Sequence, residues 1–454
     1  MLGADALRRL FGFIAFVYLA RRITPADFGI VNIAFTVLSY GLMASSAGLT
    51  TLGARDAARP SSSDLIDSIV SLRIVLAVIT YSCVFLIAQF VMKNALLTSM
   101  VTVMSLSIIV QSVLLEWFFQ GREEMRVVAI SRSIAATIYL IVVLVYVHSS
   151  ADLMWVAVGS VLSDLTAVTV LGVAYKKFHD GRMIRFQFHG WKTMLTNAFS
   201  IGIGTMLGHF SIQLPLIIIG TVLTNADAGI YAAASKLVIF LLMFDRVFGT
   251  VLLPVSSRLH ASSPEMLSSV FSTAMRWVLI CALPVCVGGT LLADRLLPFV
   301  FGETYRFAVP VFQILIWYFF VTMVHTIYTS GLIAIGMERQ YSRMMLMSFS
   351  AYTVTSFAGA ILFGISGVAG AVVCSEIITL LLMRRMLHQT VKTHITPKVL
   401  NIVLSVVIMG VLVLLLPQIN IILIIIIGGI SYSAVLFATK TITPGELAAL
   451  MKNV

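Results

Sequence analysis

Residues 213–249 read QLPLIIIGTVLTNADAGIYAAASKLVIFLLMFDRVFG. Two apolar segments flank a short polar turn, and Asp245 and Arg246 lie about halfway along the second segment. The turn has an echo 200 residues earlier, since TNADAGI at 224–230 matches TPADFGI at 24–30 at five of seven positions. An apolar segment precedes the turn and another follows it in both places. We therefore predict that the chain is organised as a duplication around this hairpin.

The composition of the whole chain places it in a membrane. Apolar residues make up 59% and charged residues 11%, with a mean hydropathy of +1.03. A soluble domain has about 45–50% apolar and about 25% charged residues. The net charge of +11 is explained by basic cytoplasmic loops, so we predict no nucleic-acid partner. The four cysteines lie in apolar segments without metal-ligand spacing and predict no disulfide framework.

A helix needs ~20 mostly apolar residues to cross a bilayer, and fourteen segments satisfy this rule. They fall near 2–20, 29–53, 66–92, 96–120, 125–147, 152–174, 194–222, 229–255, 272–293, 307–335, 343–365, 367–387, 398–416 and 419–438. The prediction is an all-α polytopic membrane protein. It has two parallel six-helix halves, an appended helix pair and no soluble domain. The predicted parts are the halves 1–175 and 194–390, a cytoplasmic linker 176–193, the helix pair 13–14 within 391–438, and a cytoplasmic tail 439–454.

Lysine and arginine in the connecting loops predict the orientation. With the N-terminus inside, eighteen of them face the cytoplasm and five face outward. Cytoplasmic loops carry the excess of basic residues in membrane proteins. Both termini are therefore predicted to be cytoplasmic.

Ionisable residues inside the predicted helices are functional candidates, because each costs ~2.5 kcal/mol or more at a helix centre on insertion scales. Those nearest the middle of their helices are Asp164, Asp245, Arg246 and Glu376. For these four we favour side chains that face a cavity over buried structural pairs. Those near cytoplasmic ends are Arg73, Glu116, Arg132 and Arg276. For this second set we favour interfacial anchors or local ion pairs.

The basic residues suggest that the cavity holds an anion. Arg8 and Arg9 lie on the first helix, in the half that the echo relates to Arg246. If the halves enclose one cavity, these guanidinium groups approach one another across it, and a guanidinium fork suits phosphate oxygens. Lys236 either extends this basic path outward or anchors its helix at the interface.

Four stretches also carry a family resemblance. They are LARRITPADFG at 19–29, EWFFQGREEMRVVAISR at 116–132, the hairpin at 213–256, and FGETYRFAVPVFQIL at 301–315 leading to GLIAIGMERQ at 331–340. Together they resemble the Wzx-type polysaccharide-biosynthesis flippases of the multidrug/oligosaccharidyl-lipid/polysaccharide exporter superfamily. The resemblance runs from about residue 10 to about residue 390.

This resemblance implies a flippase for an undecaprenyl-pyrophosphate-linked oligosaccharide, located in the bacterial inner membrane. Helices 1–6 would rock against helices 7–12 to give alternating access. An H⁺ or Na⁺ gradient would drive the cycle through Asp164, Asp245 or Glu376. Membrane lipids, and polysaccharide polymerase and chain-length machinery, would be further partners.

Two alternatives remain open. The nearer one keeps the fold and exports a drug or metabolite by ion-coupled antiport. The more remote one is a membrane polysaccharide polymerase or ligase, which we expect to present catalytic groups on a long outward loop. The sequence contains no P-loop, nucleophile elbow or metal-ligand cluster. We therefore predict that the protein is not an enzyme and needs no cofactor.

Overall fold

The computed structural model describes residues 2–58, 63–178, 185–188, 190–262, 264–388, 398–416, 420–443 and 445–446. Every regular element among them is a helix. Parts of the predicted linker 176–193 and of the predicted tail 439–454 lie outside the described residues. The chain forms two compact units, Met1–Ala232 and Ala233–Val454. The predicted boundaries of two six-helix halves stay a prediction.

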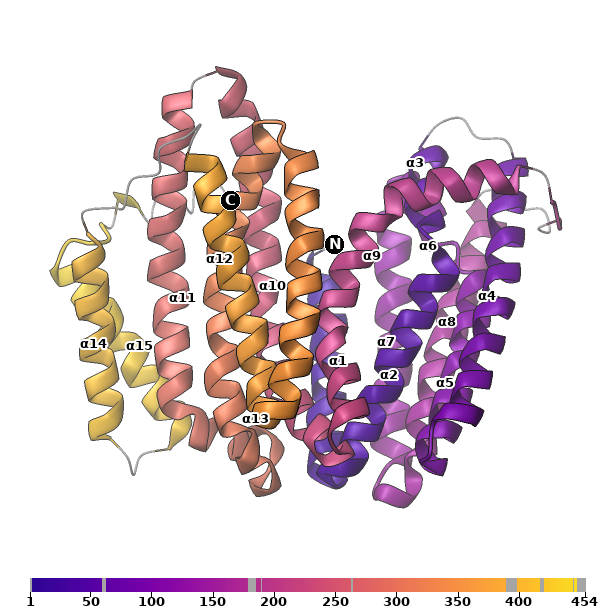
Figure 1. The fold of residues 1–454 in the computed structure, drawn as a ribbon, viewed down its shortest axis with the longest axis horizontal. Coiled ribbons are helices and arrows are strands. Elements are labelled where there is room, and N and C mark those ends of the chain that lie inside the picture. Colours follow the sequence, from indigo (N-terminus) through magenta and orange to yellow (C-terminus); the bar gives the residue numbers. More distant parts are fainter. Residues whose placement is uncertain are drawn as a thin grey trace. The chain divides into compact units, whose positions relative to one another are not determined.

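Unit 1 is a bundle of long helices with two short ones at one end (Figure 1). Its elements are α1 (Leu2–Arg22), α2 (Pro25–Ser46), α3 (Leu49–Ala57), α4 (Ser63–Val91), α5 (Ala95–Ser112), α6 (Glu116–Gly121), α7 (Met125–Tyr146), η1 (Ser150–Asp152), α8 (Met154–Phe178) and α9 (Trp191–Val222), followed by the start of α10 (Asn225–Ser262). Helix α5 packs against α2, α4 and α8, and α1 packs against α7.

Two predicted spans in unit 1 are interrupted. The predicted helix 29–53 breaks at Ala47 and Gly48, whose φ angles of 44° and 81° are left-handed, and such angles end an α-helix. The predicted helix 96–120 likewise ends at Ser112, and the short α6 follows. The short helices α3 and α6 then pack against each other. A Cβ at Gly53 would lie 2.5 Å from Cε3 of Trp117, so only glycine allows this approach.

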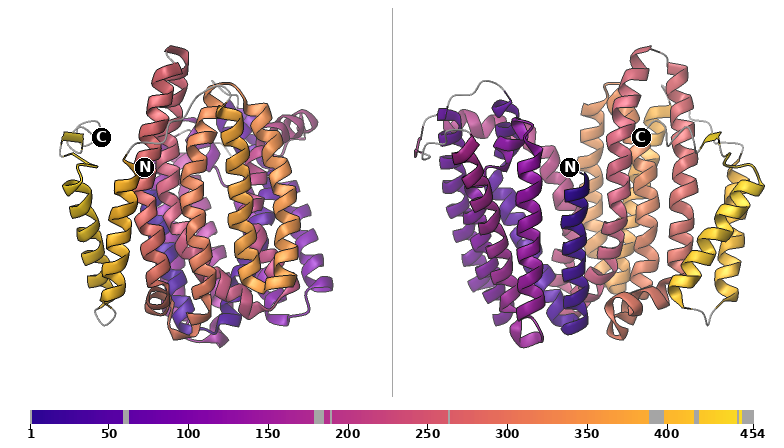
Figure 2. Two further views of the ribbon diagram at one scale, coloured as in Figure 1. Left: turned by 60° about the vertical axis from the view of Figure 1, so that its left-hand side comes forward. Right: turned by 180° about the vertical axis from the view of Figure 1, so that it is seen from behind.

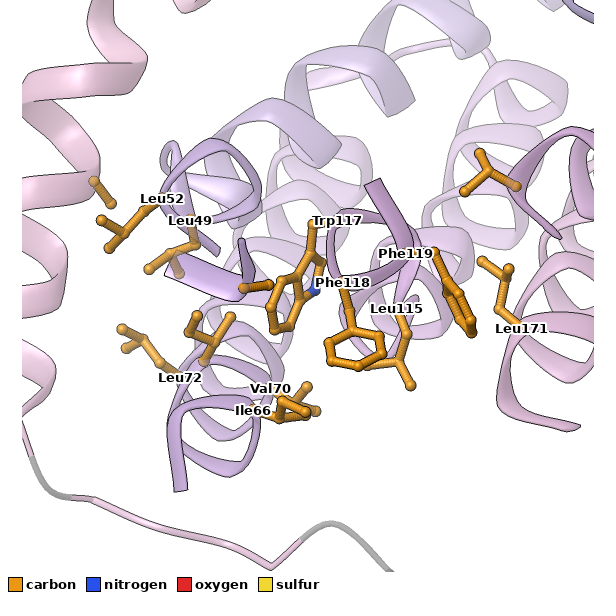
Figure 3. Packing of buried hydrophobic residues seen from close by; sticks show 14 of the residues in the cluster. Leu49, Leu52, Ile66, Val70, Leu72, Leu115, Trp117, Phe118, Phe119 and Leu171 are labelled. Atoms are coloured by element: carbon orange, nitrogen blue, oxygen red, sulfur yellow. The ribbon is translucent and has the colours of Figure 1, made fainter. Parts of the chain in front are cut away.

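The space around α6 is filled by a hydrophobic cluster of unit 1 (Figure 3). Trp117, Phe118 and Phe119 are each at most 2% exposed and pack with Leu49 and Leu52 of α3 and with apolar residues of α4. Burying an aromatic side chain contributes roughly 1.5–3 kcal/mol. This cluster therefore fixes α3 and α6 against the bundle.

The two echoed motifs form the same helix start. Thr24 Oγ1 accepts a hydrogen bond from Asp27 N (3.2 Å) and donates one to Asp27 Oδ2 (2.7 Å). Thr224 makes the equivalent bonds with Asp227, at 3.1 and 2.6 Å. Threonine side chains satisfy the free N–H groups of a helix N-terminus in this way. The echo is thus a shared local structure. Superposition of the complete halves stays a prediction.

The echoed motifs also touch each other, because the first turns of α10 belong to unit 1. A Cβ on Gly29 would lie 1.8 Å from the backbone oxygen of Asn225, and a Cβ on Gly229 would lie 1.8 Å from that of Pro25. The contact is reciprocal, with each glycine facing the carbonyl four residues before the other. Small residues let helices in membranes approach this closely.

Among the described residues, unit 2 contains the rest of α10 and five further helices. They are α11 (Pro264–Phe301), α12 (Val309–Ala334), α13 (Glu338–His388), α14 (Val399–Leu415) and α15 (Ile421–Ala438), with the 3₁₀ turn η2 (Glu303–Ala308) before α12. Within α13 the φ of Gly364 is 60°, and a Cβ on Gly359 would lie 2.6 Å from the oxygen of Gly367. The chain therefore folds back on itself there, between the two predicted segments 343–365 and 367–387.

The predicted helix pair 398–416 and 419–438 is present as α14 and α15, which lie beside α11 (Figure 1 and Figure 2). Tyr432 on α15 donates its hydroxyl hydrogen to Ile280 O on α11 (2.8 Å). Arg276 on α11 pairs with Glu446 after α15 (2.9 Å) and donates to Thr441 O (2.6 Å). Arg276 thus forms an ion pair, one of the two roles expected for it, and this pair ties the segment after α15 to α11.

Ten helices among the described residues are long and apolar enough to cross a membrane, and α14 and 212–222 are shorter apolar helices. The protein is a multi-pass membrane protein with an all-helical fold. The predicted number of fourteen spans is not confirmed.

Candidate functional site

Unit 2 brings together several of the ionisable side chains that lie in apolar helices. His325 on α12 hydrogen-bonds through Nδ1 to Oε1 of Glu376 on α13. The next residue, Thr326, donates to Oδ1 of Asp245 on α10 (2.7 Å). Asp245 also interacts electrostatically with His325 and Glu376. We call Asp245, His325, Thr326 and Glu376 the carboxylate–histidine cluster.

Helical geometry explains why these residues meet. His325 and Thr326 are consecutive, so their side chains project about 100° apart and reach two neighbouring helices. His325 turns to α13, and Thr326 turns to α10. The side chains of His325 and Glu376 are 12% and 17% exposed. This burial keeps their mutual attraction strong, because little water screens it.

The cluster can hold protons. It contains two carboxyl groups and one imidazole, so its net charge changes with each proton taken up. Nε2 of His325 is buried and has no hydrogen-bond partner among the described residues. The described residues contain no group of three or more His, Cys, Asp or Glu that could hold a metal ion.

The other predicted acid, Asp164, belongs to unit 1. It is half-buried on α8 and lies beside Ser107 and Gln111 of α5. The structure therefore brings Asp245 and Glu376 into one site and places Asp164 in another.

The predicted anion-binding residues are distributed over both units. Arg8 is exposed and Arg9 half-buried on α1 in unit 1. Arg246 is exposed and Lys236 half-buried, both on the part of α10 in unit 2. Arg246 directly follows Asp245, so this one predicted basic residue lies in the same turn of α10 as the Asp245 of the carboxylate–histidine cluster. The convergence of Arg8 or Arg9 with Arg246 stays a prediction.

Residues near the predicted cytoplasmic ends form local contacts in unit 1. Arg132 on α7 forms an ion pair with Glu116 at the start of α6. Gln120 donates to Glu116 (2.6 Å). Arg73 on α4 donates to the carbonyl groups of Leu114 (2.9 Å) and Gln111 (2.6 Å) at the end of α5. The predicted local ion pair is thus confirmed for Arg132 and Glu116.

An apolar groove in unit 2 was not predicted from the sequence. It lies among α11, α12, α13 and the start of α14, and has a volume of about 300 Å³. Eight of its ten lining residues are apolar, and Tyr328 and the exposed Arg384 are the two others. No local pattern could have revealed it, because its walls come from four helices.

Comparison with known families identifies the chain. The sequence model of a family described as "Polysaccharide biosynthesis protein" matches residues 1–260, more than half of the chain. The chain belongs to this family. Among curated proteins, none is significantly similar to the chain in sequence.

Solved structures show which fold the chain adopts. The lipid II flippase MurJ in an inward closed conformation has a TM-score of 0.75 at 14% identity, with 97% of this chain and 99% of that chain covered. An inward-facing multidrug resistance MATE family transporter of the MOP superfamily has a TM-score of 0.69 at 12% identity, with 84% and 95% covered. A MOP superfamily transporter from Pyrococcus furiosus has a TM-score of 0.53 at 13% identity, with 85% and 93% covered. The chain therefore has the fold of MOP superfamily transporters.

Proposed function

We propose that the protein is a flippase that carries an undecaprenyl-pyrophosphate-linked oligosaccharide across the bacterial inner membrane for surface polysaccharide biosynthesis. Membership of the polysaccharide biosynthesis family over residues 1–260 carries this proposal. The MOP superfamily fold supports it, because proteins with this fold include a lipid II flippase.

The chemistry of the cargo fits the basic residues. A hydroxyl-rich, anionic head group is too costly to move through bare hydrocarbon, since each buried polar group without a hydrogen bond costs several kcal/mol. In our proposal Arg246, together with Arg8 or Arg9, binds the pyrophosphate, and Lys236 extends the basic path. Guanidinium groups bind phosphate oxygens through two parallel hydrogen bonds, which a lysine cannot do.

The apolar groove provides a place for part of the lipid. Phe271, Leu279, Ile327 and Leu381 present hydrocarbon surface to it, which suits an isoprenoid chain. Arg384 lines the same groove and can meet a phosphate. In our proposal part of the polyprenyl tail lies along this groove while the head group crosses.

We further propose that protons drive the cycle through the carboxylate–histidine cluster. Asp245 adjoins Arg246 in sequence, so a proton on Asp245 changes the charge next to the proposed pyrophosphate ligand. Glu376 and His325 share a hydrogen bond that protonation alters. Asp164 is a second candidate, in unit 1.

The proposed cargo is tested by deleting the gene and measuring the surface glycans of the deletion strain. We expect the deletion strain to lose one surface polysaccharide and to accumulate its lipid-linked precursor. Arg246→Ala should abolish complementation at an unchanged protein level, and Arg246→Lys should restore part of it. Arg306→Ala is the matched control. It removes an exposed arginine paired with Glu303, and exposed pairs contribute little.

Two results would exclude this cargo. An unchanged surface glycan with increased drug sensitivity in the deletion strain would favour the antiporter. Loss of polymer length without accumulation of precursor inside the cell would favour a polymerase or ligase.

Translocation measured in proteoliposomes under an imposed ion gradient tests which ion drives the cycle. We expect an imposed pH gradient to accelerate translocation, and His325→Gln to remove that acceleration. His148→Gln changes an exposed histidine between α7 and η1 and should have no effect. Acceleration by a Na⁺ gradient alone would contradict the proton proposal.

A further inference from the structure

The connection between α8 and α9 carries a surface that the proposed transport sites do not use. Residues 176–192 read KKFHDGRMIRFQFHGWK and contain five Lys or Arg against one acidic residue. The structure describes 176–178, 185–188 and 190–192 of this stretch. Its two ends meet, because Ala174 near the end of α8 and Trp191 at the start of α9 belong to the same apolar packing in unit 1.

Residues 185–188, which we call the strap, are fixed to the start of α4. Arg185 N donates to Oδ1 of Asp67 (3.1 Å), and Gln187 N donates to Oγ of Ser71 (3.0 Å). Asp67 and Ser71 are 2% and 0% exposed. Hydrogen bonds in such buried surroundings are stronger than those in water. The strap is therefore an ordered part of unit 1.

The strap presents aromatic rings on its outer side. Gln187 turns inward, where its Oε1 accepts from Ser68 Oγ (3.0 Å) and its backbone oxygen accepts from Trp191 Nε1 (2.9 Å). Phe186 and Phe188 are 52% and 70% exposed. The ring of Trp191 lies 5.0 Å from that of Phe188, between centroids. These rings form one cluster, and its exposed apolar area marks a surface that another apolar phase covers.

This cluster lies at the level where two candidate membrane spans end. The strap binds Asp67 and Ser71, which are in the first turns of the span Ile66–Val91, and it follows the end of the span Met154–Phe178. The first turns of α9 run across this end of unit 1 (Figure 1). Aromatic side chains are enriched at this level, where acyl chains meet lipid head groups.

The charge around the rings indicates which lipids they meet. The exposed basic residues of this stretch are Lys176, Lys177, Arg185 and Lys192. Basic residues that flank a membrane span are attracted to anionic lipids. An acidic protein would also match this charge. The location beside the ends of membrane spans and the exposed phenylalanines favour lipid.

We propose that this surface binds anionic lipids of the surrounding leaflet. Its aromatic cluster lies among the upper acyl chains, and its four basic residues contact the lipid phosphates. The bonds from α4 hold the strap in the geometry that this contact needs. The proposal concerns the resident bilayer and is independent of the transported cargo.

Quenching of Trp191 fluorescence by brominated lipid tests the surface. Full-length protein is placed in phosphatidylcholine nanodiscs that contain equal shares of either brominated phosphatidylglycerol or brominated phosphatidylcholine. Subtracting the signal of Trp191→Phe isolates the contribution of Trp191. We expect phosphatidylglycerol to bind at least about fivefold more tightly, the effect of one basic residue at an anionic surface. Added salt should reduce this preference.

Charge variants test the contact with phosphate. Lys192→Gln and Arg185→Gln should each lower the preference for phosphatidylglycerol about fivefold. Lys93→Gln is the matched control, because Lys93 is an exposed lysine between α4 and α5. It should leave the preference at Trp191 unchanged.

A variant of α4 tests the role of the strap bonds. Ser71→Ala removes a buried hydroxyl group that accepts from Gln187 N, and it should lower the preference although Ser71 is buried away from lipid. Ser256→Ala is its control, because Ser256 is equally buried and donates to Leu252 O within α10 (2.8 Å). If Trp191→Phe fails to fold, native mass spectrometry counts the phosphatidylglycerol molecules that the protein retains. Lys192→Gln should then retain fewer than wild type.

Three results would overturn the inference. The first is equal quenching of Trp191 by the two brominated lipids. The second is a preference, or a number of retained lipids, that Lys192→Gln and Arg185→Gln leave unchanged. The third is no quenching by either lipid, which would place the aromatic cluster in water and favour an acidic protein as its partner.

Discussion

The contact between the two echoed motifs predicts a strong effect of adding one methyl group. In Gly29→Ala the new Cβ would lie 1.8 Å from the backbone oxygen of Asn225, whereas real Cβ contacts essentially never fall below 3.0 Å. The first turns of α2 and α10 must therefore separate by about 1.2 Å, the difference between these two distances. No side chain can move away to relieve the clash, because the opposing atom belongs to the backbone.

The expected magnitude follows from two opposing effects. Overpacking a close contact costs typically 1–3 kcal/mol, and a rigid backbone neighbour puts this case near 3 kcal/mol. Replacing glycine by alanine in a helix returns about 0.5–1 kcal/mol of backbone entropy. The net loss for Gly29→Ala is thus roughly 2 kcal/mol. Gly229→Ala should lose about as much, since its Cβ would lie 1.8 Å from Pro25 O.

Thermal unfolding in detergent measures this loss. Gly172→Ala on α8 is the control, because no atom lies within 4 Å of its added Cβ, and it should be neutral or slightly more stable. The double variant should lose less stability than the sum of the losses in the two single variants. The first methyl group already separates the helices, so the second one no longer clashes as strongly. If Gly29→Ala unfolds at the same temperature as Gly172→Ala, the reasoning is wrong.

Three further changes test other contacts. Tyr432→Phe removes the hydrogen bond from α15 to Ile280 O on α11 and should cost about 1 kcal/mol, seen as faster hydrogen exchange in α15 than in wild type. Arg73→Leu leaves the carbonyl groups of Gln111 and Leu114 without this donor. It should lower the free energy of unfolding by about 2–3 kcal/mol. An unchanged melting temperature would show that the arginine is dispensable. Hydrogen bonds from Arg276 and Thr443 lower the pKa of Glu446 from its ordinary 4.5 to about 2. The ionised carboxylate therefore contributes its full stabilisation above pH 4.5, and this contribution is lost as the pH falls toward 2. Because the side chain is 39% exposed, the loss should be only about 1 kcal/mol. The stability difference between wild type and Glu446→Gln should therefore shrink by this amount as the pH falls over that range.

The helices could be predicted from the sequence because hydrophobic segments of sufficient length are a strong signal. The predicted pair 398–416 and 419–438 differs from α14 and α15 by at most two residues at any end. The breaks after α2 and α5 were missed because a rule of segment length and hydropathy does not register backbone angles, such as the left-handed φ of Ala47 or the irregular angles of Val113.

The sequence allowed some residues of the site to be predicted, but it did not show how they are arranged in space. Asp245 and Glu376 stood out because each is ionisable inside an apolar segment. Their meeting at His325 and Thr326 could not be foreseen, because His325 and Glu376 are 51 residues apart.

The location of the buried charges bears on how alternating access could work. Glu116 pairs with Arg132 inside unit 1, while His325 bonds to Glu376 and Asp245 to Thr326 inside unit 2. Separating the partners of such half-buried contacts costs free energy, because each polar or charged group loses its compensating neighbour. A movement of one unit as a rigid body leaves these contacts intact, so none of them opposes it. Rocking of this kind therefore requires only contacts outside these clusters to change. A proton on Asp245 alters the charge beside Arg246, which is where we propose that the cargo binds.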